Sequence, residues 1–268
     1  MDIALVYPVA GMSSRFNGEI KQFAKIGNNE TLIERSLKQA IPAGFTKIIF
    51  IVGEKTEKPF KEKFGNNYNG IPVEYCKQSY NPEERKKPWG SADALCSAKE
   101  ILDCPFVFCN GDDLYGKNAF RLLIKHIKEK KTCATIGYRL GNVIPEEGAV
   151  NRGIFTIEGN LVKSLKEMIG IEKSRLNEKN LSEDNLCSMN IFALNSEVVR
   201  MLNEIVEEFK ERNKGNSTIE CFLPEELSEL IKQKKIEIEI YSTHEKCIGI
   251  THPGDELKVR EQLDQQNL

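Results

Sequence analysis

The chain has 268 residues, enough to bury a hydrophobic core in one large domain or two small ones. Charged residues make up 29% of it and the formal net charge is −2, which gives no reason to expect general attraction to nucleic acid or anionic membranes. It contains no apolar run of about 18 residues and no basic segment followed by an apolar core, so we expect neither a transmembrane helix nor a signal peptide.

The eight cysteines form no Cys-x-x-Cys pair, and most of them lie within apolar runs. Structural zinc and a disulfide framework are therefore disfavoured. We expect reduced, buried thiols in a cytoplasmic protein. His126, His244 and His252 show no metal-ligand spacing and are expected to be surface or packed residues.

Residues 1–140 alternate between strand and helix patterns. The predicted strands are 3–9, 47–52, 72–76 and 105–109, and the predicted helices are 30–40, 56–64, 91–102 and 117–130. The run KIIFIV is apolar throughout, as expected of a strand covered on both faces. This rhythm predicts an α/β protein with a mainly parallel sheet, helices on both faces, and ligands beyond the carboxyl ends of the strands.

The pattern changes after about residue 140. A hairpin is predicted over 153–165, turning at 158–160, and residues 171–186 have few apolar anchors and are expected to form a mobile surface segment. The remaining prediction is of strands at 187–194 and 236–241 and helices at 196–213, 222–234 and about 255–265. There is no internal repeat, so we expect a single domain over 1–268.

The stretch PVAGMSSRFNGEIKQF, residues 8–23, takes a strand directly into a turn of small residues. Such a turn lets backbone N–H groups approach an anion, and Arg15 adds a permanent charge suited to phosphate oxygens. The alternative is an ordinary strand-to-helix turn. The stretch is neither GxxxxGK[ST] nor GxGxxG, which disfavours a P-loop and a dinucleotide site.

The stretch PFVFCNGDDLYG, residues 105–116, is a buried strand that ends in two adjacent carboxylates, Asp112 and Asp113. Two like charges together are unfavourable without a cation, and Mg²⁺ prefers hard oxygen ligands. The alternative is a tight turn chosen for its backbone geometry. The sequence therefore predicts a magnesium site at this strand end.

Both stretches resemble signature motifs of the nucleotidylyltransferases, which join a nucleoside triphosphate (NTP) to a sugar 1-phosphate or a related phosphate. The loop matches at Pro8, Ala10, Gly11, Ser14, Arg15, Phe16 and Lys21. Gln22 stands where sugar-type members usually carry Pro, and KQF is similar to cytidylyltransferases of isoprenoid precursor synthesis. The segment WGSADALCSAKEIL, residues 89–102, is similar to the Gly-Thr-Ala-x-Ala motif of the sugar-nucleotide branch.

The resemblance implies a Rossmann-like, three-layer, GT-A-like nucleotidyltransferase fold with a mixed, mostly parallel central sheet. Residues 1–140 would form the nucleotide-binding half and 141–268 the acceptor-binding half. It implies catalytic roles for Arg15, Lys21 and Asp112. It implies nucleotide contacts by Ala10, Gly11, Met12, Ser13, Ser14, Gln78, Gly90, Ser91 and Asp113. For Gln78, expected at the base edge, a solvated loop residue is the alternative.

The resemblance in the second half is weaker. Gly153, Glu167 and Asn190 would face the acceptor. The family usually has Lys after that Glu, where this chain has Met168, so either Lys163 or Lys166 takes over or the phosphate contact differs. Asp112 would bind the metal. The second carboxylate is open, with Asp255 and Glu220 as candidates, because longer relatives have an Asp near the position of Gly249.

CSMNIFAL, ECFLPEEL and CIGITHPGDELKV resemble a bacterial subgroup of short sugar-nucleotidyltransferase-like proteins. The resemblance implies a cytoplasmic, Mg²⁺-dependent enzyme that transfers NMP from an NTP to a sugar 1-phosphate. Alternatives are a cytidylyltransferase acting on phosphocholine or another alcohol phosphate, an inactive nucleotide-binding module, and a glycosyltransferase. The expected partners are the NTP and the sugar phosphate, not nucleic acid or membrane. The base, the sugar and the oligomeric state stay open, a homo-oligomer included.

Overall fold

The computed structural model of the chain describes residues 1–11, 19–27, 29–250 and 254–266. Within them, ten strands form one mixed sheet, in the order β10-β11-β13-β9-β12-β7-β1-β4-β6-β5. Their bounds are β1 Ala4–Pro8, β4 Lys47–Val52, β5 Asn67–Tyr68, β6 Ile71–Lys77, β7 Phe106–Phe108, β9 Cys133–Arg139, β10 Val150–Glu158, β11 Leu161–Ile171, β12 Leu186–Leu194 and β13 Ile238–Thr243. Two short ribbons pair β2 (Lys25–Gly27) with β3 (Glu30–Thr31) and β8 (Asp113–Leu114) with β14 (Ile248–Gly249).

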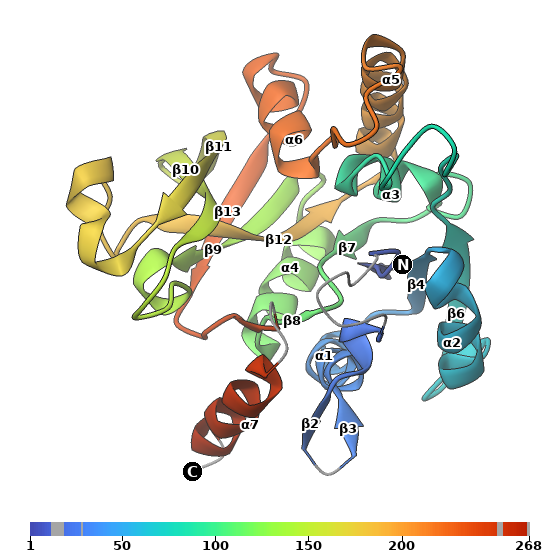
Figure 1. Cartoon of the computed structure of the whole chain (residues 1–268), viewed down its shortest axis with the longest axis horizontal. Helices are drawn as coiled ribbons and strands as arrows, with labels where there is room; N and C mark the ends of the chain where they lie inside the picture. Colours follow the sequence, from blue (N-terminus) through green and yellow to red (C-terminus); the bar gives the residue numbers. More distant parts are fainter. Residues whose placement is uncertain (12–18, 28, 251–253, 267–268) are drawn as a thin grey trace.

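Helices cover both faces of the sheet, which gives three layers (Figure 1). One face carries α1 (Leu32–Ala40), α2 (Glu54–Phe64) and α4 (Lys117–Glu129), and the other carries α3 (Ser91–Ser97), α5 (Ser196–Arg212) and α6 (Leu223–Lys232). The alternation of strand side chains explains the two cores, because Leu5 and Tyr7 of β1 join the first and Ala4 and Val6 join the second. The remaining helices are α7 (Asp255–Gln266) and the short 3₁₀ turns η1 (Lys21–Phe23), η2 (Ile41–Ala43), η3 (Leu140–Asn142) and η4 (Lys173–Lys179).

Parallel pairing joins four strands of the first half of the chain, and it also joins β9 to β13, which lies in the second half. β7, β1, β4 and β6 are parallel neighbours, whereas β12 runs antiparallel to both β7 and β9. The sheet is therefore mixed, as expected, and it continues through both halves of the chain. The reversal beside β7 places loops of the second half next to the carboxyl ends of β1 and β7.

Most predicted elements are present close to their predicted bounds, but the sequence reasoning missed β9, a central strand. The predicted helix over 91–102 ends at Ser97. The expectation of a mobile surface segment over 171–186 is wrong in its premise of few apolar anchors. The segment contains η4, and Leu176 and Leu181 are buried in the core.

All eight cysteines are free thiols, and most of them are buried. His126 is buried in α4, and its ring nitrogens form hydrogen bonds with the Tyr241 hydroxyl (3.0 Å) and the Thr132 carbonyl oxygen (2.8 Å). None of the helices in the described residues has the length and apolar character needed to cross a bilayer.

Candidate active site

The acidic turn predicted after residues 105–109 lies where expected, directly beyond the carboxyl end of β7. Lys21 of η1 forms an ion pair with Asp112, and about a fifth of each side chain is exposed (21% and 23%). Because β1 and β7 are parallel neighbours, the loop that leaves β1 starts beside this turn. The structure therefore brings together a lysine and a carboxylate that the sequence predicted from separate stretches.

Asp113 has an environment different from that of its neighbour. Burial is the main cause that raises the pKa of Asp113, to about 7, and repulsion from Asp112 adds to it. A hydrogen bond from Asn110 Nδ2 to Asp113 Oδ2 (2.9 Å) lowers the pKa and opposes this shift. In the β8–β14 ribbon, Asp113 pairs with Gly249, and a Cβ atom at position 249 would collide with Asp113 Oδ1. The Asp113 carboxyl therefore fills the space that a side chain at 249 would need.

The acidic pair fits a hard divalent cation. Two adjacent carboxyl groups, one of which resists ionisation beside the other, are an oxygen donor set that a dication stabilises. In the described part of the chain, no group of three His, Cys, Asp or Glu side chains is arranged to hold a metal. Of the two candidates for a second carboxylate, Glu220 instead pairs with Lys87.

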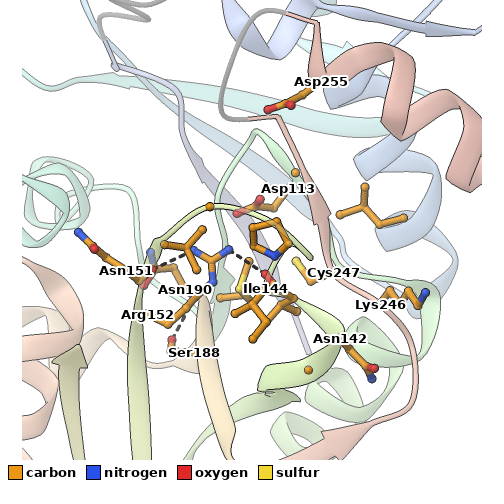
Figure 2. A pocket seen from close by; sticks show the side chains of 18 of the residues that line it. Asp113, Asn142, Ile144, Asn151, Arg152, Ser188, Asn190, Lys246, Cys247 and Asp255 are labelled. Carbon is orange, nitrogen blue, oxygen red and sulfur yellow. Dashed lines mark hydrogen bonds between the residues drawn. The ribbon is translucent and has the colours of Figure 1, made fainter. Parts of the chain in front are cut away.

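A cavity of about 950 Å³ opens beside the acidic pair, within the size range of small-molecule sites. Its walls come from the loop after β7, residues 141–153, β11, β12, residues 246–250 and α7 (Figure 2). The predicted acceptor and metal residues that line it, together with Asp112 and Asp113, are Gly153, Glu167, Asn190 and Asp255. With the acidic pair, these residues come from five separate segments, and the fold gathers them in one pocket.

Local strand geometry shapes the wall of this pocket. Gly153 faces both Glu167 of β11 and Ser188 of β12. The register of β12 shifts after Ser188, and Asn190 there adopts a positive φ of 57°, which Asn tolerates better than most residues. Burial raises the pKa of Glu167. The pocket thus combines a half-buried carboxyl with an irregular strand that turns a polar side chain inward.

The expected nucleotide residues Gln78, Gly90 and Ser91 form a second group outside the lining of this cavity. Gln78 is 6% exposed, which rules out a solvated loop residue. Its Nε2 donates to the Gly90 carbonyl oxygen (3.0 Å) and to Asp93 Oδ2 (2.7 Å). Both amide hydrogens are thereby used, so only the Gln78 carbonyl oxygen remains to face a ligand.

Other expected nucleotide residues have structural contacts or lie outside the described part of the chain. Ser91 Oγ accepts a hydrogen bond from the backbone N–H of Leu223 (2.9 Å), which ties α3 to α6. Ala10 follows β1, and its carbonyl oxygen would lie 2.8 Å from a Cβ atom at Gly53. Gly11 is exposed. Met12, Ser13, Ser14 and Arg15 lie outside the described residues.

The sequence reasoning missed two pocket residues, Asn110 and Arg152. Asn110 orients Asp113, and it was visible as the first residue of the Asn-Gly-Asp-Asp turn. Arg152 lines the cavity and precedes Gly153, in the same quoted segment. An acidic pair and a lysine beyond the carboxyl ends of parallel strands, beside a pocket of this size, are the arrangement expected of an α/β protein with a small-molecule site at the edge of its sheet.

Comparison with known proteins assigns the family. The chain belongs to the nucleotidyl transferase family, whose model matches residues 17–241. Among curated proteins, no relative matches the chain.

Solved structures share the fold over almost the whole chain. A protein described as a glucose-1-phosphate thymidylyltransferase from Bacillus anthracis has a TM-score of 0.71 and 12% identity, covering 97% of this chain and 94% of its own. A UDP-glucose pyrophosphorylase complexed with UDP-glucose has a TM-score of 0.70 and 15% identity, covering 99% and 100%. The inositol-1-phosphate CTP transferase from T. maritima has a TM-score of 0.67 and 14% identity, covering 99% and 97%.

Proposed function

We propose that this protein transfers NMP from an NTP to a sugar 1-phosphate, forming an NDP-sugar and releasing pyrophosphate. The observation that supports this best is the Lys21–Asp112 ion pair beyond β7, at the rim of a cavity suited to a small polar acceptor. The family match supports nucleotidyl transfer, and the two neighbours named for glucose phosphates or UDP-glucose support the acceptor class.

The proposed chemistry needs no general base, because the attacking phosphate oxygen is already ionised. Catalysis then depends on positioning and on neutralising charge. Lys21 would neutralise charge on the α-phosphate. Asp112, with Asp113 beside it, would hold Mg²⁺. When bound, this ion would neutralise negative charge between the two reacting phosphates.

We assign the remaining residues by half of the chain. In residues 1–140, the 10–14 loop and Arg15 would hold the β- and γ-phosphates, and Gln78 with Gly90 would face the base. In residues 141–268, Gly153, Glu167 and Asn190 would face the acceptor. The eight free thiols support a reducing compartment such as the cytoplasm.

A second candidate keeps the chemistry and changes the acceptor, with CTP as the donor. CTP with an alcohol phosphate is favoured by the resemblance of KQF to cytidylyltransferases and by the structural similarity to an inositol-1-phosphate CTP transferase. Four NTPs tested against glucose 1-phosphate, inositol 1-phosphate and phosphocholine, with pyrophosphate release as the readout, separate the candidates. Pyrophosphate release with none of these pairs would contradict both.

The variant Asp112→Ala tests the assignment of the acidic pair. We expect turnover to fall by roughly 100-fold or more, because the metal and Lys21 both lose their carboxylate partner. The far-ultraviolet circular dichroism spectrum should be unchanged. Asp103→Ala is the matched control, since Asp103 precedes β7 as Asp112 follows it, and its side chain is 78% exposed. Mg²⁺-dependent turnover retained by Asp112→Ala would refute the assignment.

A further inference from the structure

Among the described residues, three cationic side chains line the cavity, and they differ in how free they are to contact a ligand. Lys173 is paired with Glu146 at 2.5 Å, and Lys246 is exposed. Arg152 is partly buried, and both terminal nitrogens of its guanidinium make hydrogen bonds. Its Nη1 donates to the Asn151 carbonyl oxygen (2.9 Å) and its Nη2 to the Val143 carbonyl oxygen (3.1 Å), as the dashed lines in Figure 2 show.

The Arg152 guanidinium has N–H donors that these two hydrogen bonds do not use. Each terminal nitrogen carries two hydrogens and makes one of these bonds, while Nε is buried without a partner. An unpaired buried donor on a charged group is costly. The guanidinium therefore keeps free N–H groups, and an acceptor oxygen that enters the pocket could accept from them.

Arg152 lines the same cavity as Glu167, and its positive charge lowers the pKa of the Glu167 carboxyl, which burial raises. A phosphate beside an ionised Glu167 would be repelled by it. The positive charge of Arg152 would offset that repulsion.

Arg152 lies at an irregular point of the β10–β11 pair. The register shifts between Val150 and Arg152, Arg152 is opposite Met168 of β11, and the next pair is Gly153 with Glu167. Lys163 and Lys166, the two lysines considered from the sequence, do not line the cavity, and Lys163 pairs with Glu158. The positive charge beside Glu167 is thus supplied across the strand pair.

We propose that Arg152 binds the phosphate group of the acceptor. The inference rests on the proposed function. It assigns the phosphate contact that a lysine at position 168 would make in the family pattern, where this chain has Met168. A guanidinium suits this task because its planar fork can offer two parallel N–H donors to two phosphate oxygens. The two backbone carbonyl bonds hold the side chain in place beforehand, which lowers the entropy lost on binding.

Kinetics of Arg152→Ala and Arg152→Lys test the proposal. We expect Arg152→Ala to raise KM for the acceptor by about 10- to 100-fold, with little change in KM for the NTP. Arg152→Lys should fall between wild type and Ala, because it keeps the charge and loses the fork. Lys166→Ala is the control and should leave both KM values unchanged.

A purely structural role for Arg152, clamping residues 143 and 151, predicts a different result. Arg152→Ala and Arg152→Lys would then lower the melting temperature alike, and would change both KM values together or neither. That result would overturn the proposal. Arg152→Lys remains informative if Arg152→Ala does not fold.

A binding experiment separates this proposal from the proposed function. Glucose 1-phosphate and inositol 1-phosphate are titrated by calorimetry into wild type and Arg152→Lys, with a non-hydrolysable NTP analogue occupying the nucleotide site. Weaker binding to the variant supports Arg152 even if no NTP turns over. Normal turnover by wild type with equal binding to both proteins would refute Arg152 and leave the proposed function intact.

Discussion

The two adjacent aspartates, Asp112 and Asp113, have different environments. Asp112 is ion-paired with Lys21, whereas Asp113 is held by Asn110 and is disfavoured as an anion by burial and by Asp112. Two adjacent residues of the same type therefore have different properties. The difference arises because Asp113 begins β8, where it is enclosed against Gly249.

The Asp113 carboxyl should make stability depend on pH. Its pKa of about 7 in the folded protein exceeds the ordinary value of 3.8, so between these values the folded state keeps a proton that the unfolded state releases. This group's contribution to the free energy of unfolding therefore falls as pH rises from 3.8 to about 7. The variant Asp113→Asn, measured in the presence of a metal chelator, should lose this contribution to the pH dependence of the free energy of unfolding. Urea denaturation at pH 5 and pH 8 checks this, and identical pH dependence in both proteins would contradict it.

At the scale of elements, the start of α3 depends on a backbone contact between distant segments. The Cys221 N–H donates to the Trp89 carbonyl oxygen (2.6 Å), and the Ala92 N–H donates to the Cys221 carbonyl oxygen (3.1 Å). Gly90, at the N-cap, has φ of 106°, and a Cβ atom there would lie 2.8 Å from the Cys221 nitrogen. Glycine is required twice, by conformation and by space.

Gly90→Ala should therefore be more destabilising than an alanine introduced at an open glycine. Gly215 has φ of 88° with no heavy atom near the added Cβ, so Gly215→Ala should cost only backbone strain, about 1 kcal/mol. Gly90→Ala adds a collision with backbone, and we expect a loss of about 3 kcal/mol or more in the free energy of unfolding. Chemical denaturation of both variants measures the difference. Equal losses of stability in the two variants would show that the backbone around Cys221 can move to accommodate the added Cβ without a free-energy penalty.

For the whole molecule, a third hydrophobic cluster connects the C-terminal helix to the acidic turn. Val259 and Leu263 of α7 pack with Ile26, Leu32, Leu114, Ile248 and Ile250. Leu114 and Ile248 are partners in the ribbon that also pairs Asp113 with Gly249. The docking of α7, at the bottom of Figure 1, therefore supports the ribbon that holds Asp113 in place.

Leu263→Ala tests this support, because Leu263 does not itself line the cavity. We expect a loss of about 2 kcal/mol in the free energy of unfolding, together with a lower kcat at a temperature where the variant stays folded. Leu202→Ala is the control. It removes a buried leucine of α5 from a different cluster and should destabilise without lowering kcat. If both variants kept wild-type kcat, the third cluster would not support the site.

The sequence by itself determined the local features of this protein. Apolar runs and helical periodicity gave most strands and helices, and a buried strand ending in Asp112 and Asp113 marked the acidic turn, because these signals depend on neighbouring residues. Only the tertiary structure decided the central position of β9, the ion pair of Lys21 with Asp112, the enclosure of Asp113 by Gly249 and the position of Arg152 opposite Met168. Each of these depends on strand order and register, which are fixed by contacts between segments far apart in the chain.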